Sequence, residues 1–144
     1  MSLNVLYLAG PMTGVPQFNF PLFAEWATKL RGVGFIVINP SEEDPEEAQA
    51  LARCSLTGHI DDLGGFDHRM AALRNVQGVM SADAIALLPG WQKSSGTRHE
   101  VETAHRFCLD VAPAHLWLAL GQVNQCRDRL AGVTPGFDFE PGAA

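Results

Sequence analysis

The residues best suited to chemistry lie in residues 87–100, which join an apolar run, a polar loop and a helical pattern. The apolar run, residues 84–88, predicts a buried strand that ends at Pro89-Gly90, and a helix is predicted to begin near Thr97. Backbone N–H groups at the start of a helix that follows such a loop can bind an anion. Glu100 adds a carboxylate to the first turn of this helix. The segment therefore predicts an anion-binding loop beside a carboxylate.

A second interpretation of the same residues is structural. Thr97 and Glu100 have the spacing of a capping box, in which the glutamate side chain only satisfies backbone N–H groups at the start of the helix. The spacing leaves both interpretations open, and the rest of the chain must decide between them.

Composition limits the class of protein. The chain has 144 residues, of which 47% are hydrophobic and 18% charged, and this balance is typical of one globular domain. A net charge of −6 argues against a polynucleotide partner, although a small nucleotide needs only a few local cations. The three cysteines have no metal-site spacing, which favours reduced thiols and a cytoplasmic location. No apolar stretch approaches the ~20 residues of a membrane span, and the first residues are expected to form a strand, not a signal peptide.

Hydrophobic periodicity predicts strands alternating with helices, and hence a parallel sheet of four to five strands covered on both faces. We expect the globular domain to span residues 1–130, before a Gly/Pro-rich tail at 131–144. Strands are predicted at residues 4–9, 35–39, 83–88 and 115–120. Helices are predicted at residues 21–31, 46–53, 66–82, 97–109 and 122–130. The core-facing side chains are expected to be Phe20, Phe23, Ala24, Ala27 and Leu30 in the first helix, Met70, Leu73, Val76 or Gln77, and Met80 in the third, and Val101, Ala104 and Cys108 in the fourth.

The carboxyl ends of parallel strands lie at one edge of the sheet, where ligands bind. The loops that follow Ala9 and Leu88 should therefore face each other across one crevice. Tyr7, the single tyrosine of the chain, lies near the end of the first strand. Its hydroxyl needs a partner if it is buried. Glu100 is a candidate, because the first strand should lie beside the strand that precedes Glu100. An ordinary core tyrosine would fit the same pattern.

Three motifs resemble the nucleoside 2-deoxyribosyltransferase superfamily, and within it a branch of short, often phage-associated proteins of unassigned function. They are Tyr-Leu-Ala-Gly-Pro-Met-Thr-Gly at residues 7–14, Asn75-x7-Asp83, and Ser94-x-Gly96-x3-Glu100. The resemblance spans about residues 4 to 110. It implies a flavodoxin-like (Rossmann-like) three-layer fold, oligomers with shared active sites, and cleavage of an N-glycosidic bond without a cofactor or metal.

The resemblance also implies roles for individual residues. Glu100 matches the nucleophile that forms a covalent glycosyl-enzyme, and Tyr7 matches the tyrosine that orients it. Ser94 matches the position that contacts the sugar 5′ group, where 5′-monophosphate hydrolases have a serine. Its neighbours Lys93, Ser95 and Arg98 would suit a phosphate, although a solvated loop with a helix cap is the alternative. The remaining substrate-binding candidates are Gly10, Pro11, Met12, Gly96 and Trp91, although Trp91 could equally anchor its loop.

One position departs from the superfamily pattern. Asn75 stands where an aspartate usually protonates or anchors the leaving base. An asparagine can form hydrogen bonds to a base but cannot supply an acidic proton. Another acid, such as Asp61, Asp62 or Asp67, would then have to act, or the substrate differs, or activity is weak or absent.

The sequence therefore predicts an enzyme that cleaves or transfers at the N-glycosidic bond of a (deoxy)nucleoside or its 5′-monophosphate. The alternatives are a catalytically silent nucleotide-binding module and a phosphoribohydrolase of the Pro-Gly-Gly-x-Gly-Thr type. The expected partners are this small molecule and further copies of the chain, which would associate through the apolar residues 18–23. Four further expectations concern other side chains. Asn19 is expected to cap the first helix, with a place in the pocket lining as the alternative, and Asp83 is expected to be structural. Cys54, His59 and His68 are expected to bind no metal, and residues 137–140 resemble the aromatic-acidic tail of some transferases.

Overall fold

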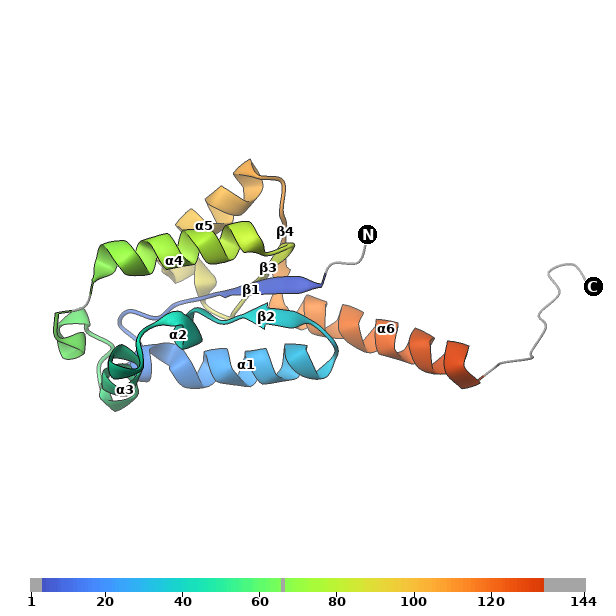
Figure 1. Ribbon diagram of the computed structural model, residues 1–144, viewed down its shortest axis with the longest axis horizontal. Helices are drawn as coiled ribbons and strands as arrows, with labels where there is room; N and C mark the ends of the chain where they lie inside the picture. Colours follow the sequence, from blue (N-terminus) through green and yellow to red (C-terminus); the bar gives the residue numbers. More distant parts are fainter. Residues whose placement is uncertain (1–3, 66, 134–144) are drawn as a thin grey trace, which may run out of the picture.

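A parallel four-stranded sheet forms the centre of the molecule (Figure 1). The computed structural model describes residues 4–65 and 67–133. The strands are β1 (Val5–Ala9), β2 (Ile36–Ile38), β3 (Ala84–Leu87) and β4 (Asp110–Pro113), in the order β2-β1-β3-β4. Each neighbouring pair is parallel, and Tyr7 of β1 is in register with Ile38 and Ile85. The central strand β1 is therefore paired on both sides.

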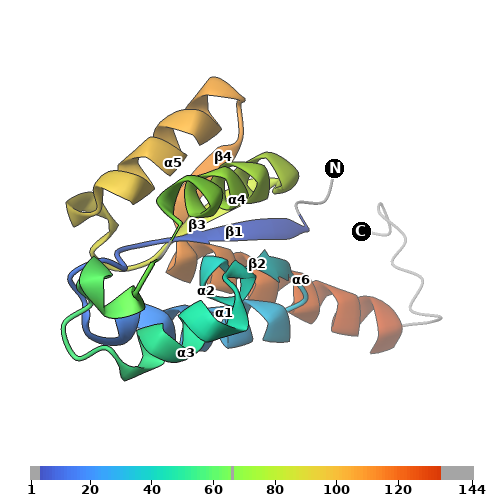
Figure 2. The ribbon, with the colours of Figure 1, turned by 60° about the vertical axis from the view of Figure 1, so that its left-hand side comes forward.

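Helices cover both faces of this sheet (Figure 2). Helices α1 (Phe20–Gly32) and α6 (Ala114–Val133) pack on one face, and α4 (His68–Ser81) and α5 (Ser95–Arg106) on the other. Side chains along β1 alternate between the two layers: Leu6 and Leu8 contact the α1 and α6 layer, whereas Tyr7 and Ala9 belong to the α4 and α5 layer. This is the flavodoxin-like three-layer α/β fold expected from the sequence.

The segment between β2 and α4 adds short elements at the carboxyl end of the strands. They are α2 (Pro40–Glu43), α3 (Glu46–Cys54) and the 3-10 turn η2 (Ile60–Leu63). Two further 3-10 turns are η1 (Pro16–Asn19) before α1 and η3 (Trp91–Lys93) before α5. In η1, Gln17, Phe18 and Asn19 all have positive φ, of 56°, 50° and 62°. Phe18 is nevertheless buried, in a small cluster with Phe20, Ala52 and Leu63.

The predicted fourth strand is wrong. Residues 115–120 are helical and form the first part of α6, while β4 lies earlier, at Asp110–Pro113. In α6, Ala114, Trp117 and Gly121 are the buried positions, a spacing of three to four residues that belongs to a helix. A short apolar run does not by itself distinguish a strand from a buried helix. The predicted helix at 122–130 is the second half of α6, which continues to Val133, and the tail 134–144 with residues 137–140 lies outside the described residues.

The predicted inner faces of the helices are only partly correct. In α1, Phe20, Phe23, Ala27 and Leu30 are buried as expected, and Ala24 is exposed. In α4, Met70, Leu73, Val76 and Met80 are 47–48% exposed, and Val79 is the buried position. The apolar residues that were predicted to face the core therefore lie on the outer face of α4. Ala104 of α5 is buried, but Cys108 follows the helix, is exposed and has φ of 59°.

Gly78 permits α4 to lie close to β1. A Cβ atom at this position would come within 2.7 Å of Cε2 and 3.0 Å of Cδ2 of Tyr7. The Tyr7 ring is buried and packed between two elements, so it could make room for this Cβ atom only by shifting its neighbours as well. The absence of a side chain at Gly78 thus lets α4 pack directly against the Tyr7 ring.

We expect Gly78→Ala to destabilise the protein, by about 1–3 kcal/mol, because the new methyl group overlaps the Tyr7 ring. An alanine in a helix interior otherwise stabilises by about 0.5–1 kcal/mol relative to glycine. Gly32→Ala is the matched control, since a Cβ at Gly32 of α1 would meet no atom within 4 Å. Urea unfolding should give opposite signs for the two variants, and stabilisation by both would show that the Tyr7 ring is free to move.

Candidate active site

The loops after β1 and β3 lie side by side, as the topology predicts. The Leu88 N–H donates to the Ala9 carbonyl at 2.8 Å, extending the pairing beyond the strands. Gly10 lies against Leu88, because a Cβ at Gly10 would come within 2.8 Å of the Leu88 Cβ. In the same way, a Cβ at Gly90 would lie 3.6 Å from the Pro11 ring. The two segments that carry the candidate residues thus share one edge of the sheet.

Helix α5 begins two residues earlier than predicted, and Ser94 is its N-cap. The Ser94 hydroxyl accepts a hydrogen bond from the Thr97 N–H at 3.2 Å. Glu100 is therefore in the second turn of α5, and the capping-box interpretation of Thr97 and Glu100 is wrong. The Ser94 side chain does not accept hydrogen bonds from the N–H groups of Ser95 and Gly96. These two groups lie in the first turn of α5, where a helix offers them no acceptor.

Glu100 instead contacts Tyr7. The Tyr7 hydroxyl donates to Glu100 Oε1 over a long distance of 3.4 Å. Tyr7 is 1% exposed and Glu100 is half-buried, on the next helix of the same layer. Burial raises the pKa of Glu100 to about 8, and the hydrogen bond from Tyr7 opposes this shift. Burial, and then the charge of Glu100, raises the pKa of Tyr7 well above its usual value.

A pocket of about 220 Å³ lies on the other side of Tyr7, between β2, α2 and α4. It brings Tyr7 together with Asn75, a candidate residue from α4. Glu100 is not among the described residues of its wall, and Tyr7 is the residue that both lines the pocket and contacts Glu100. The lining residues are Tyr7, Ile38, Pro40, Glu43, Arg74, Asn75, Gln77, Gly78 and Ser81.

The basic and hydroxyl candidates of the loop lie outside this pocket, around the start of α5. Lys93, Ser95, Gly96 and Arg98 are exposed there, and Ser94 is partly buried. Trp91 is partly buried against the cluster that contains Tyr7, Ala9 and Leu87, which is the loop-anchoring role. The structure therefore separates two groups of candidates, one at the loop and one in the pocket, and Tyr7 of the pocket contacts Glu100 of α5.

Asn19 does not cap α1 with its side chain. It occupies the N-cap position, but its Nδ2 donates to the Pro11 carbonyl at 2.9 Å. Asn19 therefore holds the loop after β1, and its left-handed backbone turns the side chain away from the helix N-terminus. Met12, the last candidate of this loop, is partly buried against two apolar clusters.

The aspartates considered as substitutes for the missing acid are engaged elsewhere. Asp67 is the N-cap of α4 and accepts hydrogen bonds from the N–H groups of Arg69 and Met70. Asp62 accepts hydrogen bonds from the hydroxyls of Ser55 and Thr57, and Asp61 lies beside His59. Asp83 accepts hydrogen bonds from the Asn4 and Val5 N–H groups at the amino end of the sheet, which is the structural role expected for it.

Sequence reasoning missed the acidic and basic residues of the pocket. Glu43 and Arg74 line it, and Arg74 Nη2 lies 3.0 Å from Asp44 Oδ1. Glu43 follows β2 closely, and residues after the end of a parallel strand are expected near a ligand site. The position of Glu43 after β2 could have indicated a role at the site. Arg74 lies in the middle of a helix, and nothing in the sequence indicates that it lines a pocket. Within residues 4–65 and 67–133, no group of three or more His, Cys, Asp or Glu residues is arranged to hold a metal ion.

The fold and the site define a class: a flavodoxin-like α/β protein with a buried tyrosine–carboxylate pair beside the carboxyl edge of its sheet. Residues 4–112 match the family described as "Domain of unknown function (DUF4406)", and the chain belongs to this family. A comparison with curated proteins finds no match. None of the described helices is both long and apolar enough to cross a membrane.

The raised pKa of Glu100 makes stability depend on pH. In the folded protein this pKa is about 8, against 4.5 for an ordinary glutamate, so the folded state holds the proton more tightly. The stability that the protonated Glu100 contributes is complete below about pH 4.5 and is lost as the pH rises toward 8. We expect Glu100→Gln, which resembles the protonated acid, to gain stability relative to the wild type across this window, by up to about 1.4 kcal/mol per pH unit.

Urea unfolding at pH 5 and pH 8.5 measures this gain. Glu102→Gln on the same helix is the control, because Glu102 is exposed. An equal difference between wild type and Glu100→Gln at both pH values would mean that Glu100 has an ordinary pKa.

Proposed function

We propose that this protein is an enzyme that cleaves or transfers at the N-glycosidic bond of a (deoxy)nucleoside or its 5′-monophosphate. The observation that carries the proposal is the contact of Tyr7 with Glu100. A carboxylate below an anomeric carbon can capture the oxocarbenium-like centre that forms as the base departs, giving a covalent glycosyl-enzyme. Water or a second base then resolves this intermediate. The resemblance of the motifs to the nucleoside 2-deoxyribosyltransferase superfamily supports the same chemistry.

The environment of Glu100 fits a nucleophile that is held ready by one hydrogen bond. Its burial weakens its solvation, which favours attack once the proton has left, and Tyr7 orients Oε1. Glu100 must be ionised to attack. Because its pKa is about 8 in the free protein, we expect kcat/KM for substrates whose leaving base needs no protonation to rise with pH until about pH 8.

The two groups of candidates suit the two ends of a nucleotide. Typical ligand sites have volumes of roughly 300–1,000 Å³. At about 220 Å³ the pocket is smaller and would hold only part of a nucleotide. We assign the base to this pocket, beside Asn75, and the 5′ group to the start of α5. There Lys93, Arg98 and the first N–H groups of the helix would face a phosphate.

The proposed partners are a small-molecule nucleoside or nucleotide and further copies of this chain. The superfamily resemblance supports a homo-oligomer, but the apolar residues 18–23 do not provide its interface. Phe18, Phe20 and Phe23 are at most 7% exposed and belong to the core of the subunit. The three cysteines are free thiols, which supports a cytoplasmic setting.

A silent nucleotide-binding module is the second candidate function, and Asn75 favours it. If no other residue replaces the acid that Asn75 lacks, the pocket would bind a nucleotide and leave the glycosidic bond intact. Product analysis separates the two functions, because only the enzyme releases free base.

We expect Glu100→Ala to abolish base release while the protein remains folded, because the covalent intermediate cannot form. Chromatography of free base from a panel of nucleosides and 5′-monophosphates measures the loss, and circular dichroism checks the fold. A slow 2-fluoro-sugar substrate should add its glycosyl mass to Glu100. An adduct on another residue, or full turnover by the variant, would remove Glu100 from the role of nucleophile.

We expect 5′-monophosphates to bind more tightly than the matching nucleosides, because of the cations at the start of α5. Loss of one charge-assisted contact typically costs about 1.5–3 kcal/mol. Lys93→Ala and Arg98→Ala should each reduce the preference, which calorimetry measures directly. Arg106→Ala, at the opposite end of the same helix, is the control. Equal affinity of the wild type for both ligand types would exclude a phosphate site here.

A further inference from the structure

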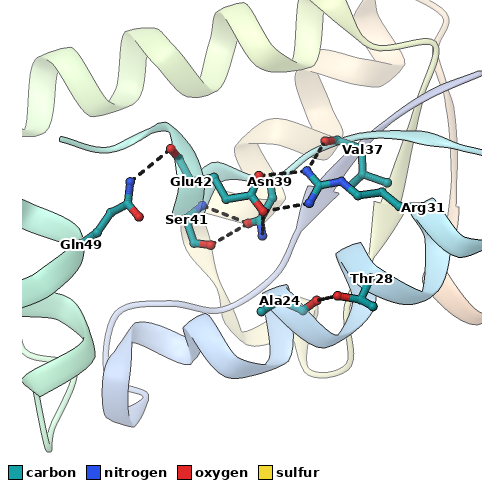
Figure 3. Close-up of polar contacts among 8 residues, drawn as sticks. All are labelled: Ala24, Thr28, Arg31, Val37, Asn39, Ser41, Glu42 and Gln49. Carbon is teal, nitrogen blue, oxygen red and sulfur yellow. Dashed lines mark hydrogen bonds and ion pairs between the residues drawn. The ribbon is translucent and has the colours of Figure 1, made fainter. Parts of the chain in front are cut away.

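Three successive acidic residues, Glu42, Glu43 and Asp44, end α2, and only the middle one is unpaired. Glu42 accepts hydrogen bonds from Arg31 Nη1 and Nη2 at 2.9 and 2.8 Å (Figure 3). Asp44 accepts one from Arg74 at 3.0 Å. Glu43 forms no hydrogen bond or ion pair with any residue in the described ranges. Its neighbours on both sides are therefore fixed while its own carboxyl group is free to react.

The backbone that carries Glu43 is itself held in place. The Asn39 side chain caps α2 by accepting hydrogen bonds from the N–H and hydroxyl of Ser41, at 3.0 and 2.8 Å (Figure 3). On the other side, Gln49 Nε2 donates to the carbonyls of Glu42 and Asp44, at 3.2 and 2.7 Å. A short helix with this many side-chain contacts to its backbone keeps a defined position for the group it presents.

Glu43 faces the same pocket as Tyr7 and Asn75, and it comes from a different element of the pocket wall. The charge of Glu43 is the smallest of the causes that raise the pKa of Tyr7, after burial, Glu100 and Asp44. Glu43 shares a pocket with Tyr7 and lies on α2, whereas Glu100 contacts the Tyr7 hydroxyl from α5. Two carboxyl groups around one centre are the arrangement that glycoside-cleaving enzymes use.

The pocket otherwise lacks an acid that could protonate a leaving base. Asn75 has no acidic proton, Asp44 is paired with Arg74, and Asp61, Asp62 and Asp67 lie outside the residues that line the pocket. Among the described residues of the pocket wall, Glu43 is the one carboxyl group. Glu43 is therefore the carboxyl group of the pocket wall that could supply the proton that the proposed reaction needs.

We propose that Glu43 is the catalytic acid and base of the glycosidic cleavage, acting on the leaving base in the pocket; this rests on the proposed function. In the first step the C1′–N bond breaks and its electron pair passes to the base, which takes the proton of the Glu43 carboxyl. A Glu100 oxygen bonds to C1′. In the second step the Glu43 carboxylate takes a proton from water, the water oxygen bonds to C1′, and the bond from C1′ to Glu100 breaks. The products are free base and sugar, and both glutamates return to their first state.

The test compares Glu43→Gln with the wild type on two kinds of leaving base. Ordinary nucleoside 5′-monophosphates need protonation of the base, whereas the base of 7-methylguanosine 5′-monophosphate already carries a positive charge before cleavage and leaves as a neutral molecule. General acid catalysis typically contributes 10²–10⁴-fold, so we expect the rate of base release in the first turnover of ordinary nucleotides to fall by about that factor. On the methylated nucleotide this first-turnover rate should change by less than about tenfold, because only the later attack of water still needs Glu43. Glu47→Gln on the exposed face of α3 is the matched control and should act as wild type on both substrates.

A second variant tests whether the position of the acid is right. Asn75→Asp adds a carboxyl group to the wall of the same pocket, and we expect it to restore part of the lost rate in the Glu43→Gln background. Equal loss on both kinds of substrate, or no loss on either, would overturn the role of Glu43 even while Glu100 remains essential. Failure of the wild type to release base from any of these nucleotides would overturn the proposed function, and the role of Glu43 with it.

Discussion

The candidate site depends on the burial of one polar group, the hydroxyl of Tyr7. The ring lies on the central strand beneath two helices and is 1% exposed, so its hydroxyl cannot keep a water shell. A buried hydroxyl without a partner costs more than most single contacts contribute. Glu100 meets this need, at the expense of its own solvation. Gly78 leaves room for this ring, and the hydrogen bond from its hydroxyl opposes the rise in the pKa of Glu100 that burial causes.

The parallel sheet brings together residues that are distant in the chain. Tyr7 is the middle residue of β1, Glu43 follows β2 on one side, and Glu100 follows β3 on the other. Because all these strands run in the same direction, each following segment emerges at one edge. The distance in sequence between Tyr7 and Glu100 is thereby reduced to a side-chain contact. The same rule explains why a helix as short as α2 carries a residue of interest.

Much of this arrangement could be predicted from the sequence, since it depends on strand order and on a few signals with local causes. Proline and glycine marked the ends of β1, β2 and β3, and the pairing of β1 with β3 then required Tyr7 to approach Glu100. The role of Asp83 was also predictable from its place before β3. The start of α5 was less certain, because Ser94 and Thr97 are both good N-cap residues and only the backbone shows which one the helix uses.

Features that depend on the whole fold could not be predicted. The outer face of α4 carries Met70, Leu73 and Met80, so hydrophobic periodicity predicted the wrong face of this helix to be buried. Its inner face instead has Gly78, whose small size is useful only once the neighbouring ring is known. Asn19 looked like a cap, but three left-handed residues redirect it to the Pro11 carbonyl. The pairing of Arg74 with Asp44, 30 residues apart, has no local signal.

The left-handed turn at Gln17–Asn19 has a consequence for how the molecule opens. Left-handed backbone costs about 1–2 kcal/mol per residue outside glycine, and here it is stabilised by burial of Phe18 against Ala52 and Leu63. Backbone hydrogen bonds from Gly14 to Gly58 and from Gln17 to Ser55 join the same two segments. Residues 14–20 and 52–63 should therefore exchange their amide hydrogens as one cooperative unit, at a lower free energy than the sheet. Each such opening would break the hydrogen bond from Asn19 to the Pro11 carbonyl. The loop after β1, at the edge of the site, would therefore become mobile whenever residues 14–20 and 52–63 open.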